Sequence, residues 1–249
     1  MAGVRAATEE FLRDTRESFR KLSWYEWLMI AVMIGIAAQA VYAAFADPLG
    51  SKNPAWLTVI NFVSAVCGIV CVFFCAHASI SNFLFGLVNT TVYAIYLWYW
   101  KIYATFALEV LFYFPMGILA WRAWANNRDA LEREQCLTRR LSLLQGAALG
   151  AAVIASGIVY HSVLVRFGGT VPWLDAYTFA IGVIAIFLQL FRFREQYVLW
   201  LLVDFVSVAM YIVHFDPVYL TKRGIYTVVA LIGFCNWYQL NRKRNPENR

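Results

Sequence analysis

Long apolar runs follow one another along almost the whole chain, and they constrain its fold more than any other feature. Of the 249 residues, 61% are hydrophobic and only 14% are charged, whereas about 25% are charged in an ordinary soluble domain. A soluble protein of this size cannot bury so much apolar surface. Because about 20 apolar residues let a helix cross a bilayer, we predict a polytopic membrane protein without a large soluble domain.

The apolar runs divide into segments of helix length, separated by turn signals such as Asp47-Pro48 and Gly168-Gly169. The alternation of polar and apolar residues that is typical of β-barrel strands is absent. We therefore predict an all-α membrane protein with eight transmembrane helices. The predicted spans are 25–46, 56–76, 80–99, 102–122, 141–161, 173–191, 197–214 and 218–240.

Basic residues are distributed unevenly between the two sides of the predicted membrane. An even number of spans places both termini on one side, and that side carries 16 of the 21 Lys and Arg residues. The positive-inside rule then predicts cytoplasmic termini, with residues 241–249 as a cytoplasmic tail. Residues 1–24 carry Phe11 and Phe19 at helical spacing between charges, which is typical of an amphipathic helix on the membrane surface. The net charge of +6 is read as a topology signal and predicts no nucleic-acid partner.

Two parts of the chain resemble each other. The matching pairs occur in the same order at nearly constant separation: Trp56 with Trp173, Asn89 with Asp204, Tyr96 with Tyr211, and Trp121 with Trp237. We predict two three-helix repeats, 56–122 and 173–240, joined by a linker helix at 141–161 and preceded by an extra span at 25–46. Such repeats have the same orientation, a plan in which the substrate site lies near the midplane between the halves.

Polar side chains inside the predicted spans mark candidate binding residues, because a polar group in lipid is costly unless it faces the protein interior. Several of them share one helix face in span 197–214, and others share the equivalent face in span 80–99. For Asp204 and Glu109, a structural hydrogen bond explains the residue as well as a substrate contact does. The predicted substrate site comprises Trp200, Asn89, Asp204, Gln189, Asn236, Tyr197, Tyr96, Tyr211 and Glu109.

Motifs of catalysis and metal binding are absent. The sequence has no HExxH, no GxSxG and no Gly-rich phosphate loop. Cys67, Cys71 and Cys75 share a helix face, but no His lies among them, so we predict no metal and no cofactor. We predict that the protein is not an enzyme. An intramembrane enzyme or sensor that uses Asp204 or Glu109 remains an alternative.

Two segments carry a family resemblance. SNFLFGLVNTTVYAIYLWYW at 81–100 and REQYVLWLLVDFVSVAMY at 194–211 resemble the PnuC family of bacterial nicotinamide riboside transporters, and the likeness extends over 56–124 and 173–241. Family members often have Glu-Asn-Trp and a second Trp three residues later. Here Gln196-Tyr197 follows the glutamate, and Trp200 takes the second position.

The resemblance implies a facilitator in the bacterial inner membrane that forms a homotrimer, with a cytoplasmic kinase trapping the imported nicotinamide riboside. Related branches are thought to carry thiamine or riboflavin, so a transporter of the same fold for another vitamin is an alternative. Asn and Gln suit the carboxamide and hydroxyls of nicotinamide riboside, and Trp and Tyr suit its cationic ring. No chain of interior carboxylates suggests a proton relay, so we expect uniport.

Overall fold

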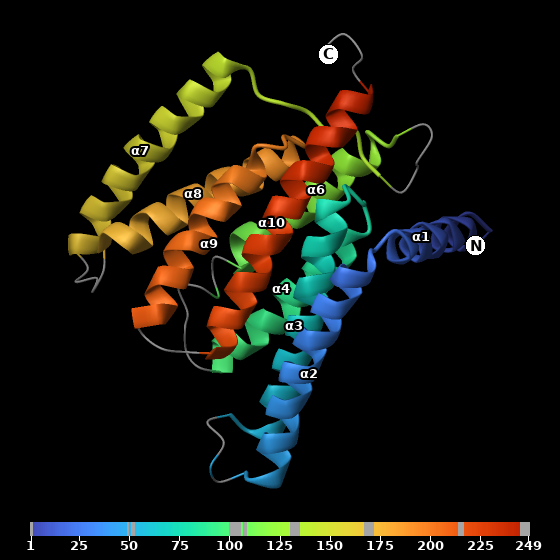
Figure 1. The fold of residues 1–249 in the computed structure, drawn as a ribbon, viewed down its shortest axis with the longest axis vertical. Coiled ribbons are helices and arrows are strands. Elements are labelled where there is room, and N and C mark those ends of the chain that lie inside the picture. Colours follow the sequence, from blue (N-terminus) through green and yellow to red (C-terminus); the bar gives the residue numbers. More distant parts are fainter. Residues whose placement is uncertain are drawn as a thin grey trace. The chain divides into compact units, whose positions relative to one another are not determined.

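The chain is helical in the computed structural model, which describes residues 2–48, 50, 53–99, 106, 109–129, 135–166, 172–213 and 217–244. It divides into two compact units, Met1–Leu137 and Thr138–Arg249. The all-α prediction is confirmed over the described residues, which hold no named strand. Figure 1 shows the helices of each unit, coloured along the chain.

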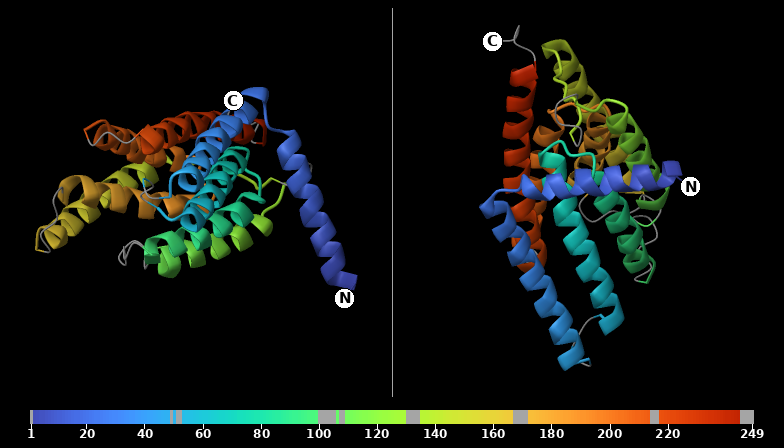
Figure 2. Two further views of the ribbon diagram at one scale, coloured as in Figure 1. Left: turned by 90° about the horizontal axis from the view of Figure 1, so that it is seen from below. Right: turned by 90° about the vertical axis from the view of Figure 1, so that its right-hand side faces the viewer.

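Unit 1 packs its long helices in chain order, with α2 against α3, α3 against α4 and α4 against α6. The helix that precedes them, α1, runs at a steep angle to α2 (Figures 1 and 2). The elements of unit 1 are α1 (Ala2–Arg20), α2 (Trp24–Ala46), α3 (Ala55–Ala76), α4 (Asn82–Tyr99), η1 (Glu109–Tyr113) and α6 (Phe114–Ala125).

A short π-helical turn, η1, leads directly into α6. Pro115 is the second residue of α6 and has no backbone N–H, so it cannot close an α-helical hydrogen bond to the preceding turn. A wider π turn before it is a known way to accommodate such a break. The first part of the predicted span 102–122 falls largely outside the described residues, and its second part is η1 and α6.

Unit 2 repeats the packing order of unit 1, with α7 against α8, α8 against α9 and α9 against α10. Each unit is therefore one leading helix followed by a three-helix repeat. The leading helix is α2 in unit 1 and α7, the predicted linker helix, in unit 2. The elements of unit 2 are α7 (Leu143–Arg166), α8 (Pro172–Leu190), α9 (Gln196–Val213) and α10 (Pro217–Arg244).

Membrane character is clearest in three of the described helices. Trp24–Ala46, Ala55–Ala76 and Leu143–Val163 are long and apolar enough to cross a bilayer. The side chains of α2 illustrate this, because Trp24 is 77% exposed and Tyr42 is 75% exposed in a helix that is otherwise almost wholly apolar. Apolar side chains without a protein neighbour are expected where the neighbour is lipid.

The turns that join the first two helices of each repeat have the same backbone structure. Ala78 and Arg192 both have a left-handed backbone, with φ of 55° and 64°. The N–H of the next residue donates to the last turn of the preceding helix in both places: Ser79 to the Phe74 carbonyl at 2.9 Å, and Phe193 to the Leu188 carbonyl at 2.8 Å. The internal repeat is therefore a structural repeat at these turns.

The turns also give the register of the repeat, which differs from the one expected from sequence. They align Asn82 with Gln196 as the first residues of α4 and α9. Ring contacts agree: Phe83 meets Trp124 edge to face at 4.8 Å, and Tyr197 meets Trp237 edge to face at 5.6 Å. The register of the turns, a separation of 114 residues, places Asn89 opposite Val203 and not Asp204. The ring contacts pair Trp124, and not Trp121, with Trp237, at a separation of 113 residues. Trp121 and Trp124 lie three residues apart on one helical face, so sequence matching alone permits that slip.

Gly233 determines how closely α10 approaches α9. A Cβ atom placed there would overlap the ring of Tyr197, which is 4% exposed. We expect Gly233→Ala to lower stability by about 1–3 kcal/mol, the usual cost of overpacking a core. Thermal unfolding of the purified protein in detergent measures this.

Gly224 on the same helix is the matched control, because a Cβ there would meet nothing within 4 Å. Gly224→Ala should leave stability unchanged or raise it slightly, since alanine favours helix. Equal unfolding temperatures for the two variants would contradict the close α9–α10 packing.

Candidate functional site

Asn89 of α4 is held by a neighbour on α3. The hydroxyl of Ser64 donates to Asn89 Oδ1 at 2.8 Å, and Ser64 is 7% exposed. This bond fixes the orientation of the amide, so the Asn89 NH₂ group is the part of the side chain that remains to donate to another acceptor. Ser64 was not among the predicted site residues, and only the structure identifies it as the residue that positions Asn89.

The other predicted site residues of unit 1 lie further along the chain. Tyr96 is half-buried, and its ring stacks on Tyr93 with centroids 5.9 Å apart. Glu109 is the first residue of η1 and is half-buried. Asn89, Tyr93 and Tyr96 recur at spacings of four and three on α4, so they lie along one stripe of that helix.

Trp200 and Asp204 lie one turn apart on α9. Trp200 is half-buried and packs against an apolar cluster in which Leu199 and Val203 of α9 face α8. Asp204 is 3% exposed. A carboxylate in so buried a position of a membrane helix is costly unless it is paired, and such residues commonly mark a binding site or a structural bond.

Tyr197 belongs to the core of unit 2. Its ring packs against the Trp237 ring and against the backbone of Gly233, which has no side chain to keep it away. Its packing therefore accounts for an aromatic residue at this position whether or not a substrate touches it.

The remaining predicted residues of unit 2 lie on all three helices of its repeat. Gln189 is in the last turn of α8, where its backbone carbonyl accepts from the N–H of Arg192 at 3.0 Å. Asn236 is half-buried on α10, directly before Trp237. Tyr211 lies on α9, and its side chain is outside the described residues. The residues expected on the second half of the site thus come from α8, α9 and α10.

Two amides with no exposed surface were not among the predicted site residues. Asn82 and Gln196, the first residues of α4 and α9, are both 0% exposed. Asn82 Nδ2 donates to the Ser79 carbonyl at 2.6 Å, but Asn82 Oδ1 and both polar atoms of Gln196 have no hydrogen-bond partner among the residues that the structure describes. An unpaired buried amide costs about 1–3 kcal/mol. Asn82 and Gln196 occupy the same position in the two repeats. A correct alignment of the repeats would have identified them from the sequence as a matching pair.

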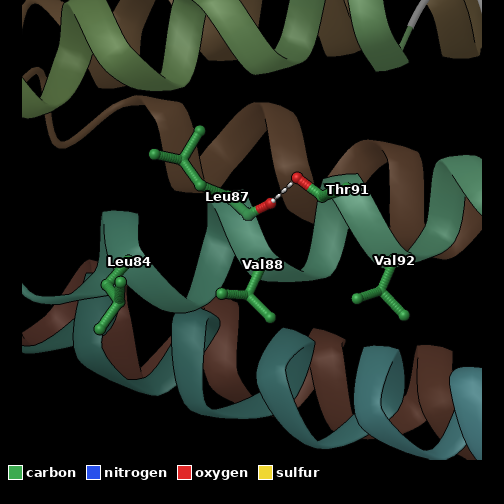
Figure 3. A pocket seen from close by; sticks show the side chains of 5 residues that line it. All are labelled: Leu84, Leu87, Val88, Thr91 and Val92. Atoms are coloured by element: carbon green, nitrogen blue, oxygen red, sulfur yellow. Dashed lines mark hydrogen bonds between the residues drawn. The ribbon is translucent and has the colours of Figure 1, made fainter.

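A shallow hollow of about 230 Å³ lies over α4. Figure 3 shows that the lining side chains all come from α4 and that the Thr91 hydroxyl turns back to the Leu87 carbonyl, to which it donates at 2.8 Å. The hollow is otherwise aliphatic, so it offers nothing to orient a polar ligand. The lining residues are Leu84, Leu87, Val88, Thr91 and Val92, and no predicted site residue is among them.

Metal-binding clusters are absent from the described part of the chain, where no three His, Cys, Asp or Glu side chains gather around a common point. The predicted site residues carry amides, hydroxyls, aromatic rings and carboxylates. These groups bind ligands by hydrogen bonding and stacking.

The unpaired Gln196 amide leads to a test. Replacing a buried, unpaired polar group with an apolar one of similar shape is neutral or stabilising. Gln196→Met should therefore keep or raise the unfolding temperature of the ligand-free protein. Asn82→Leu, the repeat-matched control, should lower it because it removes the bond to Ser79. A clear loss of stability in Gln196→Met would contradict the absence of a partner.

Comparisons with known proteins cover most of the chain. It is 29% identical over 242 residues to the nicotinamide riboside transporter PnuC of Neisseria mucosa, a match that covers 93% of this chain and 88% of the relative. It is 26% identical to the nicotinamide riboside transporter PnuC of Haemophilus influenzae, over 76% of this chain and 82% of the relative. The protein of the same name from Escherichia coli is 24% identical, over 76% of this chain and 88% of the relative.

A solved structure has the same fold. The crystal structure of the vitamin B3 transporter PnuC superposes with a TM-score of 0.72 and 27% sequence identity, over 92% of this chain and 97% of the other. The model of the nicotinamide mononucleotide transporter family matches residues 58–239, which include both repeats and the helix between them. The chain belongs to the nicotinamide mononucleotide transporter family.

Proposed function

We propose that this protein carries nicotinamide riboside across the bacterial inner membrane by facilitated diffusion. The observation that carries the proposal is the match of both repeats to a transporter family in which the relatives described above are named nicotinamide riboside transporters. The residues of the candidate site are of the kinds that such a ligand needs. The family consists of transporters, and no catalytic role for Asp204 or Glu109 enters the proposal.

The proposed architecture has eight spans in a 1+3+1+3 arrangement with both termini in the cytoplasm. The same packing order in the two units supports it, as does the division of basic residues in which 16 of 21 fall on the side of the termini. A homotrimer, with one path in each protomer, follows from the family resemblance.

The proposed site uses Trp200 as its main aromatic surface. Nicotinamide riboside carries a positively charged pyridinium ring, and an indole face attracts a cation as well as stacking on a flat ring. Asn89, with its oxygen held by Ser64, presents an NH₂ donor that suits the carboxamide oxygen or a ribose hydroxyl. Gln189, Asn236 and the Asp204 carboxylate complete the polar set.

Trp200 gives the sharpest test of the site. Trp200→Ala should weaken binding of nicotinamide riboside about 5- to 30-fold, because it removes a cation–π and stacking contact worth roughly 1–2 kcal/mol. Titration calorimetry on purified protein measures this. The control is Trp24→Ala, since Trp24 is 77% exposed on α2. Unchanged affinity in a folded Trp200→Ala protein contradicts the site.

The same calorimetry separates the related ligands. Nicotinamide riboside should bind, whereas its phosphorylated form should not, because no basic cluster among the proposed site residues would pair with a buried phosphate. Tighter binding of thiamine or riboflavin than of nicotinamide riboside would assign the protein to another branch of vitamin transport.

Transport should follow the membrane potential without a coupled ion. A cationic substrate is drawn inward by ~2.3 kcal/mol per 100 mV, which is about 50-fold accumulation. In liposomes with an inside-negative potential and no proton or sodium gradient, nicotinamide riboside should accumulate to the level that the potential sets. Uptake that requires a proton or sodium gradient at fixed potential contradicts uniport and makes Asp204 and Glu109 the first candidates for a coupling site. The proposal also includes a cytoplasmic kinase that traps the imported nicotinamide riboside by phosphorylation. The liposome assay does not test this step.

A further inference from the structure

Helix α1 is docked on unit 1 through its polar face as well as its apolar one. Asp14 is 5% exposed and Ser18 is 2% exposed, although both lie in a helix of strongly charged sequence. The Arg128 guanidinium donates to Asp14 Oδ2 at 2.6 Å. A buried carboxylate with a matching arginine indicates specific docking, because removing either partner leaves an uncompensated charge.

Two hydroxyl pairs join α1 to the 77–81 turn of the first repeat. Ser18 Oγ lies 2.7 Å from Ser79 Oγ, and Thr15 Oγ1 lies 3.0 Å from Ser81 Oγ. Ser18 and Thr15 each give their own proton to a carbonyl of α1, those of Asp14 and Phe11. Since a hydroxyl has one proton, the turn serines must be the donors in both pairs.

Aromatic contacts extend the docking to three more helices. Phe19 packs edge to face on Phe74 of α3 at 4.8 Å and on Phe85 of α4 at 6.0 Å. Phe11 packs against Trp121 of α6 at 5.8 Å. The residues expected to face lipid on this helix are thus packed against protein.

The start of α2 is tied to the same turn. Glu26 is 0% exposed and accepts from the Ser23 backbone N–H at 2.7 Å, while His77 Nε2 lies 2.9 Å from Glu26 Oε1. His77 is the first residue after α3. Together, α1 and the first turn of α2 join the ends of α3, α4 and α6 on the side that carries the turn.

The matching turn of unit 2 carries different side chains. Phe193 and Glu195 stand where unit 1 has Ser79 and Ser81, in the register that the backbone gives. There Arg139 lies over the Phe193 ring at 4.8 Å, and Glu195 Oε2 accepts from the Leu141 N–H at 3.1 Å. In each unit, the side chains of the turn therefore contact the segment that precedes the leading helix. This segment is α1 in unit 1 and residues 138–141 in unit 2.

We propose that α1 is a clasp that keeps the turn-bearing end of the first repeat together as one body throughout the transport cycle. The contacts named above then persist while the substrate path opens and closes. The uptake assay below rests on the proposed transport function, but the labelling assay does not.

Labelling tests whether the clasp stays closed. Ser79→Cys places a thiol where the native side chain is 1% exposed. Modification of this thiol by a maleimide, followed by peptide mass spectrometry, should be slow with and without nicotinamide riboside. Adding Asp14→Asn should raise the labelling rate by about tenfold or more, because it breaks a buried ion pair. Adding Glu17→Gln is the control and should leave the rate unchanged, because Glu17 is 42% exposed and its partner Arg20 is 59% exposed. Rapid labelling with native Asp14, or equally slow labelling with Asp14→Asn, overturns the proposal.

Cross-linking tests the same point during transport. Ser18→Cys with Ser79→Cys, in a background with Cys75→Ala and Cys136→Ala, should form a disulfide on oxidation because the native oxygens are 2.7 Å apart. The oxidised protein should take up nicotinamide riboside at the rate of its reduced form, within about twofold. Inhibition that a reductant reverses would overturn the clasp. Failure of uptake in the unmodified protein would count against the proposed function, and the labelling result would still decide the clasp.

Discussion

The left-handed residue in each repeat turn is the constraint on which the helix arrangement depends. A helix that ends inside an apolar bundle leaves carbonyl groups that must find donors. Here a residue with positive φ, Ala78 or Arg192, turns the chain so that the following N–H bonds back to the helix it has just left. The second helix then starts in a defined direction. Since Asn82 and Gln196 occupy the same place after these turns, every later contact of α4 and α9 follows from them.

Polar groups in these helices fall into two kinds. Some are hydrogen-bonded and hold separate segments together, as Ser64 holds Asn89 and Arg128 holds Asp14. Others, above all Gln196, are buried with unpaired atoms. In lipid, the hydrophobic effect does not drive helices together, so hydrogen bonds of the first kind help to determine which surfaces pack against each other. The second kind is where a ligand or an ordered water would be bound most favourably.

Much of the helix layout could be predicted from the sequence, because each span needs a long apolar run and each break needs turn residues. Most of the described helices begin and end near the ends of a predicted apolar segment, but the described elements in 102–122, η1 and α6, run from Glu109 to Ala125. The repeat is visible in the order of matching residues. The register could not be predicted, since Trp121 and Trp124 lie three residues apart on one helix and only the contact with Phe83 distinguishes them. The environment of α1 also escaped prediction, because an amphipathic pattern is the same whether lipid or protein covers its apolar face.

The predicted site residues were chosen as polar and aromatic side chains that share helix faces, and the structure separates them by what they contact. Tyr197 packs in the core, Asn89 is positioned by Ser64, and Trp200 keeps a half-buried ring on α9. The most direct test of the central claim is an experimental structure of the protein with nicotinamide riboside bound. The pyridinium ring should lie on the indole of Trp200. A ligand held away from Trp200, or one that occupies the aliphatic hollow on α4, would contradict the proposed site.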